Sequence, residues 1–214
     1  MSQILSNSSQ AMRGEQPNVL DGYEHVHRYW DRAFACHAAK ILPGEYYVST
    51  QGEMITTVLG SCISACVRDV DFGVGGMNHF MLPEGKSGGD CASTQARYGS
   101  FAMETLINQI IMHGGRRRRL EVKLFGGGQV LDQMTDIGAR NIAFVEEYVA
   151  EEGLLVTSRD VGDVYPRRVV FFPETGKAMV KRLRKVTNDT ITERESKYRE
   201  DLSHQPISSD VELF

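Results

Sequence analysis

Apolar and polar positions along the chain follow periods that change from segment to segment. Two apolar runs, Cys62–Arg68 and Val74–Leu82, have the composition of β-strands. The Asp- and Gly-containing stretch 69–73 between them favours a tight reversal, so the pattern predicts a β-hairpin. An extended segment with a Pro-Gly break precedes this hairpin at 41–49.

Other segments carry apolar residues at helical spacing. The segment Ser93–His113 has this spacing and is followed by Gly114 and Gly115, which supply a stop. The remaining periodic segments predict, in chain order, a strand at 120–125, a helix at 137–152, a strand at 154–162 and a hairpin at 167–183. Because hairpins stand beside strand–helix–strand pieces, the chain predicts a single layered α/β domain, with β-sandwich-like sheets containing hairpins and flanked by helices.

Polarity sets the expected limits of this domain. Residues 1–22 are polar and without an apolar period, which predicts a flexible N-terminal arm. The domain itself is expected over 23–186, with 23–39 as a short helix or an irregular wrap. Residues 187–214 are polar and of mixed charge, so we expect a tail that could contain a short helix but adds little to the core.

Composition narrows the class of protein. The 214 residues include 24 Lys and Arg against 28 Asp and Glu, a net charge of -4, which argues against nucleic acid as the main partner. No run of about 18 apolar residues and no basic-then-apolar leader occurs, so we expect no membrane insertion and no secretion. The cysteines show no CxxC pair and no zinc-ligand spacing, which predicts reduced thiols in a cytoplasmic protein and no metal site; they are Cys36, Cys62, Cys66 and Cys91.

The first hairpin carries the candidate chemistry. A turn centred on Asp71 would place His79 directly opposite Cys62, or one step off, so that an imidazole could take the thiol proton and leave a thiolate of lowered pKa. Gly60 and Ser61 could aim backbone N–H groups at a developing oxyanion, and the hydroxyl of Thr56 or Thr57 could orient the imidazole. The alternative is that Cys62 is a small core residue.

These residues also carry a family resemblance. The motif T-x-x-L-G-S-C at Thr56–Cys62 and the stretch His79–Pro83 are similar to those of the CheD family, the chemoreceptor glutamine deamidases of bacterial and archaeal chemotaxis. The resemblance extends through the glycines at 126–128, the segment Asp136–Asn141 and the ETGK turn at 174–177, and it covers roughly 41–186.

Membership of that family would imply a Cys-His-Thr triad, here Cys62, His79 and Thr56, and a fold related to the cysteine deamidase toxins. The implied reaction converts glutamine side chains of methyl-accepting chemotaxis receptor cytoplasmic domains to glutamate, with release of ammonia through a thioester and without a cofactor. A CheC-type phosphatase is a further implied partner.

Two other functions stay open at the level of sequence. The chain could be a non-catalytic interaction module that binds receptors or a CheC-type phosphatase. It could also be a small-molecule thiol hydrolase that uses the same site, although nothing in the sequence suggests a deep pocket.

Overall fold

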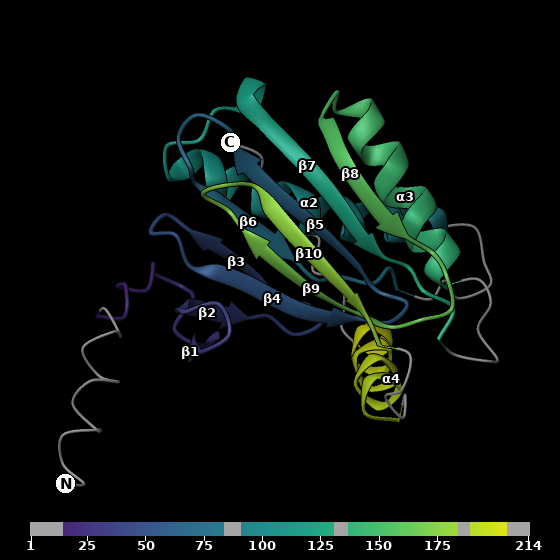
Figure 1. The fold of residues 1–214 in the computed structure, drawn as a ribbon. Coiled ribbons are helices and arrows are strands. Elements are labelled where there is room, and N and C mark those ends of the chain that lie inside the picture. Colours follow the sequence, from purple (N-terminus) through teal and green to yellow (C-terminus); the bar gives the residue numbers. More distant parts are fainter. Residues whose placement is uncertain (1–14, 84–90, 131–136, 184–188, 205–214) are drawn as a thin grey trace, which may run out of the picture.

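Two five-stranded β-sheets form the body of the protein in its computed structural model, which describes residues 15–83, 91–130, 137–183 and 189–204 (Figure 1). The first sheet has the order β1-β2-β4-β9-β10, with β1 His27–Asp31, β2 Cys36–Lys40, β4 Met54–Leu59, β9 Arg167–Phe172 and β10 Lys177–Arg182. The second sheet has the order β3-β6-β5-β7-β8, with β3 Tyr46–Ser49, β6 Gly75–Asn78, β5 Ile63–Asp69, β7 Leu120–Gly126 and β8 Leu155–Val161. The expected fold class, layered sheets with hairpins and flanking helices, is confirmed.

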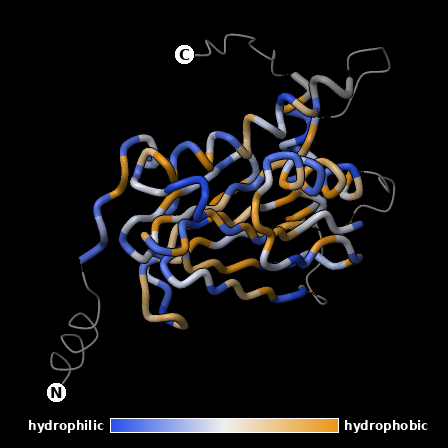
Figure 2. Tube along the Cα trace, turned by 90° about the horizontal axis from the view of Figure 1, so that it is seen from above, coloured by the Kyte–Doolittle hydropathy of each residue, from blue (hydrophilic) through white to orange (hydrophobic). Residues whose placement is uncertain are grey.

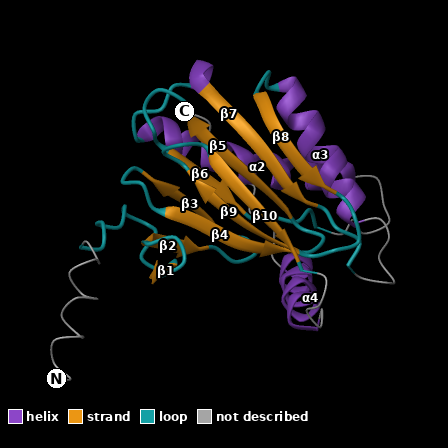
Figure 3. Ribbon diagram, viewed as in Figure 1, coloured by secondary structure: helices purple, strands orange, loops and turns teal. Residues whose placement is uncertain are grey.

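Helices cover the second sheet on the side away from the first (Figure 3). Helix α2, Cys91–Met112, contacts β3, β5 and β6, and helix α3, Ile137–Glu151, contacts β5 and β8. A short 3-10 helix, Arg117–Arg119, leads into β7, and helix α4, Asp189–His204, lies at the lower end of the sheets in Figure 1. None of the described helices is long and apolar enough to cross a bilayer.

Strand alternation in β4 determines which side chains lie between the two sheets. Ile55 and Leu59 belong to the main core, whereas Met54 belongs to a separate small cluster. Since successive side chains of a strand point to opposite faces, Thr57 shares the inner face with Ile55 and Leu59. Thr56 shares the other face with Met54. Figure 2 shows the hydrophobic colouring concentrated on the strands in the interior.

Most predicted elements are confirmed. The hairpin of β5 and β6, helices α2 and α3, strands β7 and β8 and the hairpin of β9 and β10 all occur where the periodicity placed them. The expectation of a helix or an irregular wrap at 23–39 was wrong, because β1 and β2 form an antiparallel hairpin there. Most of the expected N-terminal arm lies outside the described residues.

The expectation that the C-terminal tail adds little to the fold needs correction. Helix α4 lies within it, and the side chains of Ile191, Glu195 and Leu202 are buried. These residues recur at helical spacing on one side of α4, so the helix packs on the domain through that side.

Candidate active site

Cys62 lies where the chain crosses from one sheet to the other. Strand β4 ends at Leu59, and β5 begins in the second sheet at Ile63, so Gly60–Cys62 form the connection. Cys62 is fully buried and forms no disulfide, and the thiols of Cys36 and Cys66 are also free.

The hairpin brings His79 to the same face as Cys62, although not in the expected register. The observed pairs Cys66↔Met77 and Ile63↔Phe80 place Ser64, not Cys62, opposite His79. Cys62 is therefore a diagonal neighbour, two residues along the strand, and a shift of two keeps both side chains on one face. A ring nitrogen of His79 and the Sγ of Cys62 lie within 4.8 Å of each other.

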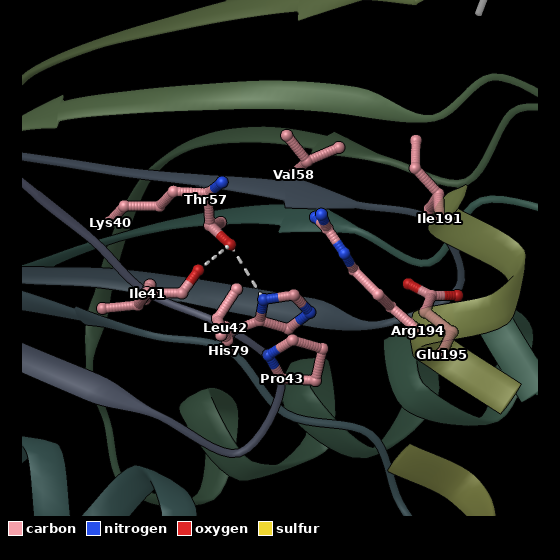
Figure 4. A pocket seen from close by; sticks show the side chains of 10 residues that line it. All are labelled: Lys40, Ile41, Leu42, Pro43, Thr57, Val58, His79, Ile191, Arg194 and Glu195. Carbon is pink, nitrogen blue, oxygen red and sulfur yellow. Dashed lines mark hydrogen bonds between the residues drawn. The ribbon is translucent and has the colours of Figure 1, made fainter. Parts of the chain in front are cut away.

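The hydroxyl that holds His79 belongs to Thr57 and not to Thr56. Thr57 Oγ1 lies 2.8 Å from His79 Nδ1 (Figure 4). Thr56 Oγ1 instead donates to the carbonyl oxygen of Val169 at 2.8 Å. Thr56, which the family resemblance implied as the third residue, is hydrogen-bonded to Val169 and not to His79 in this structure, and its catalytic role stays a prediction. The reason for these contacts is strand alternation, which turns Thr57 toward the second sheet and Thr56 away from it.

The hydrogen bonds of Thr57 fix the tautomer of His79. Thr57 Oγ1 also lies 2.8 Å from the carbonyl oxygen of Ile41, which can only accept, so the single hydroxyl proton points there. His79 Nδ1 must then be the donor to Thr57, which leaves Nε2 with a free lone pair. Within the described residues this buried Nε2 has no hydrogen-bond partner. A neutral imidazole with Nε2 available can accept a proton from a thiol.

The glycines at the end of β7 and directly after it hold the Cys62 connection in place through backbone hydrogen bonds. Gly127 N–H donates to Cys62 O at 2.8 Å and Gly128 N–H donates to Gly60 O at 2.7 Å. Gly126 has a φ of +113°, and a Cβ there would collide with the carbonyl oxygen of Cys62, so only glycine fits.

Asn141 of α3 is a positioning residue that the analysis of the sequence did not single out for this role. Its side-chain amide donates to Ser61 O at 2.9 Å and accepts from Leu82 N–H at 2.9 Å, and its side chain is fully buried. A buried amide with both ends bonded to backbone fixes the two segments that carry Cys62 and His79.

Glu195 of α4 enters the site, and no motif pointed to it. Its Oε1 accepts from Gly60 N–H at 2.8 Å and from Cys62 N–H at 3.3 Å. Its Oε2 accepts from the N–H and the hydroxyl of Ser61 at 2.8 and 2.7 Å. The backbone of the connection therefore forms an anion-binding nest, and a carboxylate fills it. The sequence feature that could have indicated a role for Glu195 is its position, because it is an acidic residue on the apolar side of an otherwise polar helix.

Burial and Glu195 set the protonation of the site. The pKa of the Cys62 thiol is raised well above its ordinary value, first by burial and then by the neighbouring Glu195 carboxylate. Burial lowers the pKa of His79 to about 3. The expected thiolate of lowered pKa is therefore not found in this arrangement: the thiol is protonated and the imidazole neutral.

Cys62, His79 and Glu195 form a group of donor types that could also hold a metal ion. Both carboxylate oxygens already accept hydrogen bonds from the nest, which fits an anion held by N–H groups better than a metal ligand. The adjoining cavity, lined among others by Leu42, Pro43 and Ile191, measures only about 20 Å³ (Figure 4), about enough for one water molecule.

Comparison with known proteins shows which family this chain is similar to. The family model for CheD chemotactic sensory transduction matches residues 81–182. A protein of Halorhodospira halophila is 54% identical over 204 residues, which are 92% of this chain and 94% of that protein. Relatives from Hahella chejuensis and Methylobacillus flagellatus are 48% and 51% identical over 97% and 92% of this chain, and over 100% and 99% of their own lengths. All three bear the name probable chemoreceptor glutamine deamidase CheD.

Proposed function

Because this chain belongs to the CheD family, we propose that it is a protein-glutamine deamidase that converts glutamine side chains of chemotaxis receptors to glutamate with release of ammonia. The observation that carries the proposal is the juxtaposition of Cys62, the free Nε2 of His79 and an N–H-lined anion site. A nucleophile, a base and an oxyanion site are the three parts that acyl transfer from an amide requires.

The geometry supports the following sequence of steps. His79 Nε2 takes the thiol proton, and the Cys62 thiolate forms a bond to the carboxamide carbon of the substrate. The resulting oxyanion accepts from N–H groups of the connection, in the place where Glu195 Oε1 now accepts from Gly60 and Cys62. His79 returns the proton to the nitrogen, the C–N bond breaks and ammonia leaves.

A water molecule completes the reaction. His79 removes its proton as the oxygen attacks the thioester carbon, the C–S bond breaks and the product is a glutamate side chain. Thr57 holds the ring in the tautomer that both halves of the reaction need, because it accepts from Nδ1–H while it donates to Ile41 O. Cys62, His79 and Thr57 thus form the proposed triad, with Thr57 in the role first expected of Thr56.

The test is incubation of a purified receptor cytoplasmic domain with the native protein and with Cys62→Ala, followed by peptide mass spectrometry and an ammonia assay. We expect amide-to-acid conversion at specific glutamines with the native protein only. A Cys62→Ala variant that deamidates the receptor at the native rate would refute the role of Cys62.

The same experiment separates the alternatives. Free glutamine turned over as fast as the receptor would indicate a small-molecule hydrolase, and binding of the receptor without conversion would indicate an interaction module. Binding of a CheC-type phosphatase and a cytoplasmic location stay predictions.

A further inference from the structure

Glu195 is buried at the reaction centre, although α4 is otherwise a polar helix. A glutamate side chain is seldom fully buried unless it is paired, and this one is only 2% exposed. Its partners are the three consecutive N–H groups of Gly60, Ser61 and Cys62, together with the Ser61 hydroxyl. The carboxylate therefore occupies the anion site that the proposed reaction uses.

The two oxygens of Glu195 correspond to the two heteroatoms of a substrate carboxamide. Oε1 accepts from the N–H of Gly60 and of the nucleophile Cys62, as the carbonyl oxygen of a bound glutamine would. Oε2 accepts from both the Ser61 hydroxyl and the Ser61 N–H. The hydroxyl can turn to accept from an amide nitrogen, whereas the N–H can only donate and gives up its bond when a carboxamide takes this place. A glutamate side chain is also the product of glutamine deamidation.

The rest of α4 packs as a docked helix. Ile191 and Leu202 are buried on the same side as Glu195, and the Tyr198 hydroxyl is hydrogen-bonded to that of Tyr98 on α2. A Cβ at Gly44 would meet the ring of Tyr198 at 2.9 Å, so the helix lies directly on the loop before β3. Figure 4 shows the Glu195 side chain reaching from α4 toward the side of the pocket that holds His79.

This occupancy is unfavourable for catalysis in its present form. The negative charge of Glu195 raises the pKa of the thiol that has to ionise, and the remaining cavity cannot take a glutamine side chain. The described arrangement therefore corresponds to a closed, resting enzyme.

We infer that α4 is an intramolecular product mimic: Glu195 lies where the side chain of the reacting glutamine binds, and the surface beneath α4 is the docking site for one helix of a protein substrate. The inference rests on the proposed deamidase function. A substrate helix displaces α4 and presents its glutamine with a non-polar residue four positions before it and an aromatic residue three positions after it, as Ile191 and Tyr198 flank Glu195.

The decisive variant is Glu195→Gln, which turns the mimic into a substrate. Cys62 should attack the carboxamide introduced at position 195 and displace ammonia, and water should then hydrolyse the thioester. The full chain thereby regains Glu195 and releases one ammonia per molecule. Peptide mass spectrometry of the purified full-length variant reads the amide-to-acid conversion directly.

Two control variants accompany this experiment. Glu193→Gln is the matched control, because Glu193 is exposed on the same helix and the glutamine placed there should persist. The double variant Glu195→Gln with Cys62→Ala should also keep its introduced glutamine, because it lacks the nucleophile.

Removal of the carboxylate gives a second, independent readout. Glu195→Ala should alkylate at Cys62 severalfold faster than the native protein at neutral pH, because removal of the carboxylate lowers the thiol pKa and raises the thiolate fraction. Receptor deamidation should also be faster, whereas Glu193→Ala should change neither rate.

The outcomes separate this inference from the proposed function. A Glu195→Gln variant that keeps its introduced glutamine and still deamidates a receptor domain would overturn the inference alone, as would Glu195→Ala with native alkylation and receptor rates. Conversion of the introduced glutamine without any receptor activity would support the placement of Glu195 and refute the receptor as substrate. If a folded protein converts neither, the deamidase function is wrong and the inference falls with it.

Discussion

Replacement of Thr57 by Val tests which hydroxyl orients the imidazole of His79, the base of the proposed reaction. Val has the shape of Thr without the hydroxyl, so the change leaves Ile41 O and His79 Nδ1–H without their bond to Oγ1. Each buried polar group left unpaired costs about 1–3 kcal/mol, so with two such groups we expect the free energy of unfolding to fall by about 2–6 kcal/mol. The imidazole also loses the acceptor that keeps its proton on Nδ1.

The effect on rate follows from the same hydrogen bond. If holding the productive tautomer is worth about 1.4–2.7 kcal/mol, kcat/KM on a receptor domain should fall about 10- to 100-fold. Thr57→Ser keeps the hydroxyl and should recover most of the activity. Thr56→Val is the matched control: it removes a buried hydroxyl that donates to Val169 O and should lower stability but change kcat/KM less than about threefold.

The assay is the initial rate of ammonia release from a receptor domain, with urea unfolding of each variant to show that it is folded. A larger loss of activity in Thr56→Val than in Thr57→Val would refute the reasoning. It would mean that the imidazole is held by the other hydroxyl in the active enzyme.

Two further predictions concern stability. Burial lowers the pKa of His79 from 6.5 to about 3, so between these pH values the unfolded chain binds a proton that the folded protein does not. The contribution of His79 to the free energy of unfolding is therefore complete above pH 6.5 and is lost as the pH falls toward 3, by on the order of 5 kcal/mol in total. Urea midpoints between pH 7 and pH 4 should therefore fall less in His79→Gln than in the native protein, and equal slopes would contradict the buried neutral imidazole. Gly126→Ala should lower the free energy of unfolding by about 1–3 kcal/mol more than Gly153→Ala does. Both glycines have a positive φ, but of the two only a Cβ at Gly126 would meet another atom, the carbonyl oxygen of Cys62. Equal losses of stability in thermal unfolding would show that this close approach is relaxed in solution.

The secondary structure could be predicted wherever one local period dominates. The hairpin of β5 and β6 and both long helices follow from such periods. The hairpin of β1 and β2 was missed because its aromatic and charged residues alternate weakly, and its pairing is settled by contact with β4. Local pattern carries little information where the partner strand decides the conformation.

The candidate site was predictable in its chemistry but not in its register. Cys62 and His79 were found from residue type and hairpin spacing, yet the true pairing differs by two positions, because the turn at Asp69–Gly73 is closed by Asp69 side-chain bonds to the N–H groups of Asp71 and Phe72. The choice between Thr56 and Thr57 depends on which face of β4 is turned toward the second sheet. A shift of one residue along the strand would exchange the two side chains between the faces.

The layered α/β class, the pairing of Cys62 with His79 and the family resemblance could be predicted from local periods and from residues a few positions apart. The contact of Thr57 with His79, the hydrogen bonds from the glycines after β7 to the Cys62 connection and the position of Glu195, 133 residues beyond Cys62, follow only from the packing of separate elements. Contacts of that kind are made when separate elements pack, and no spacing within one element encodes them.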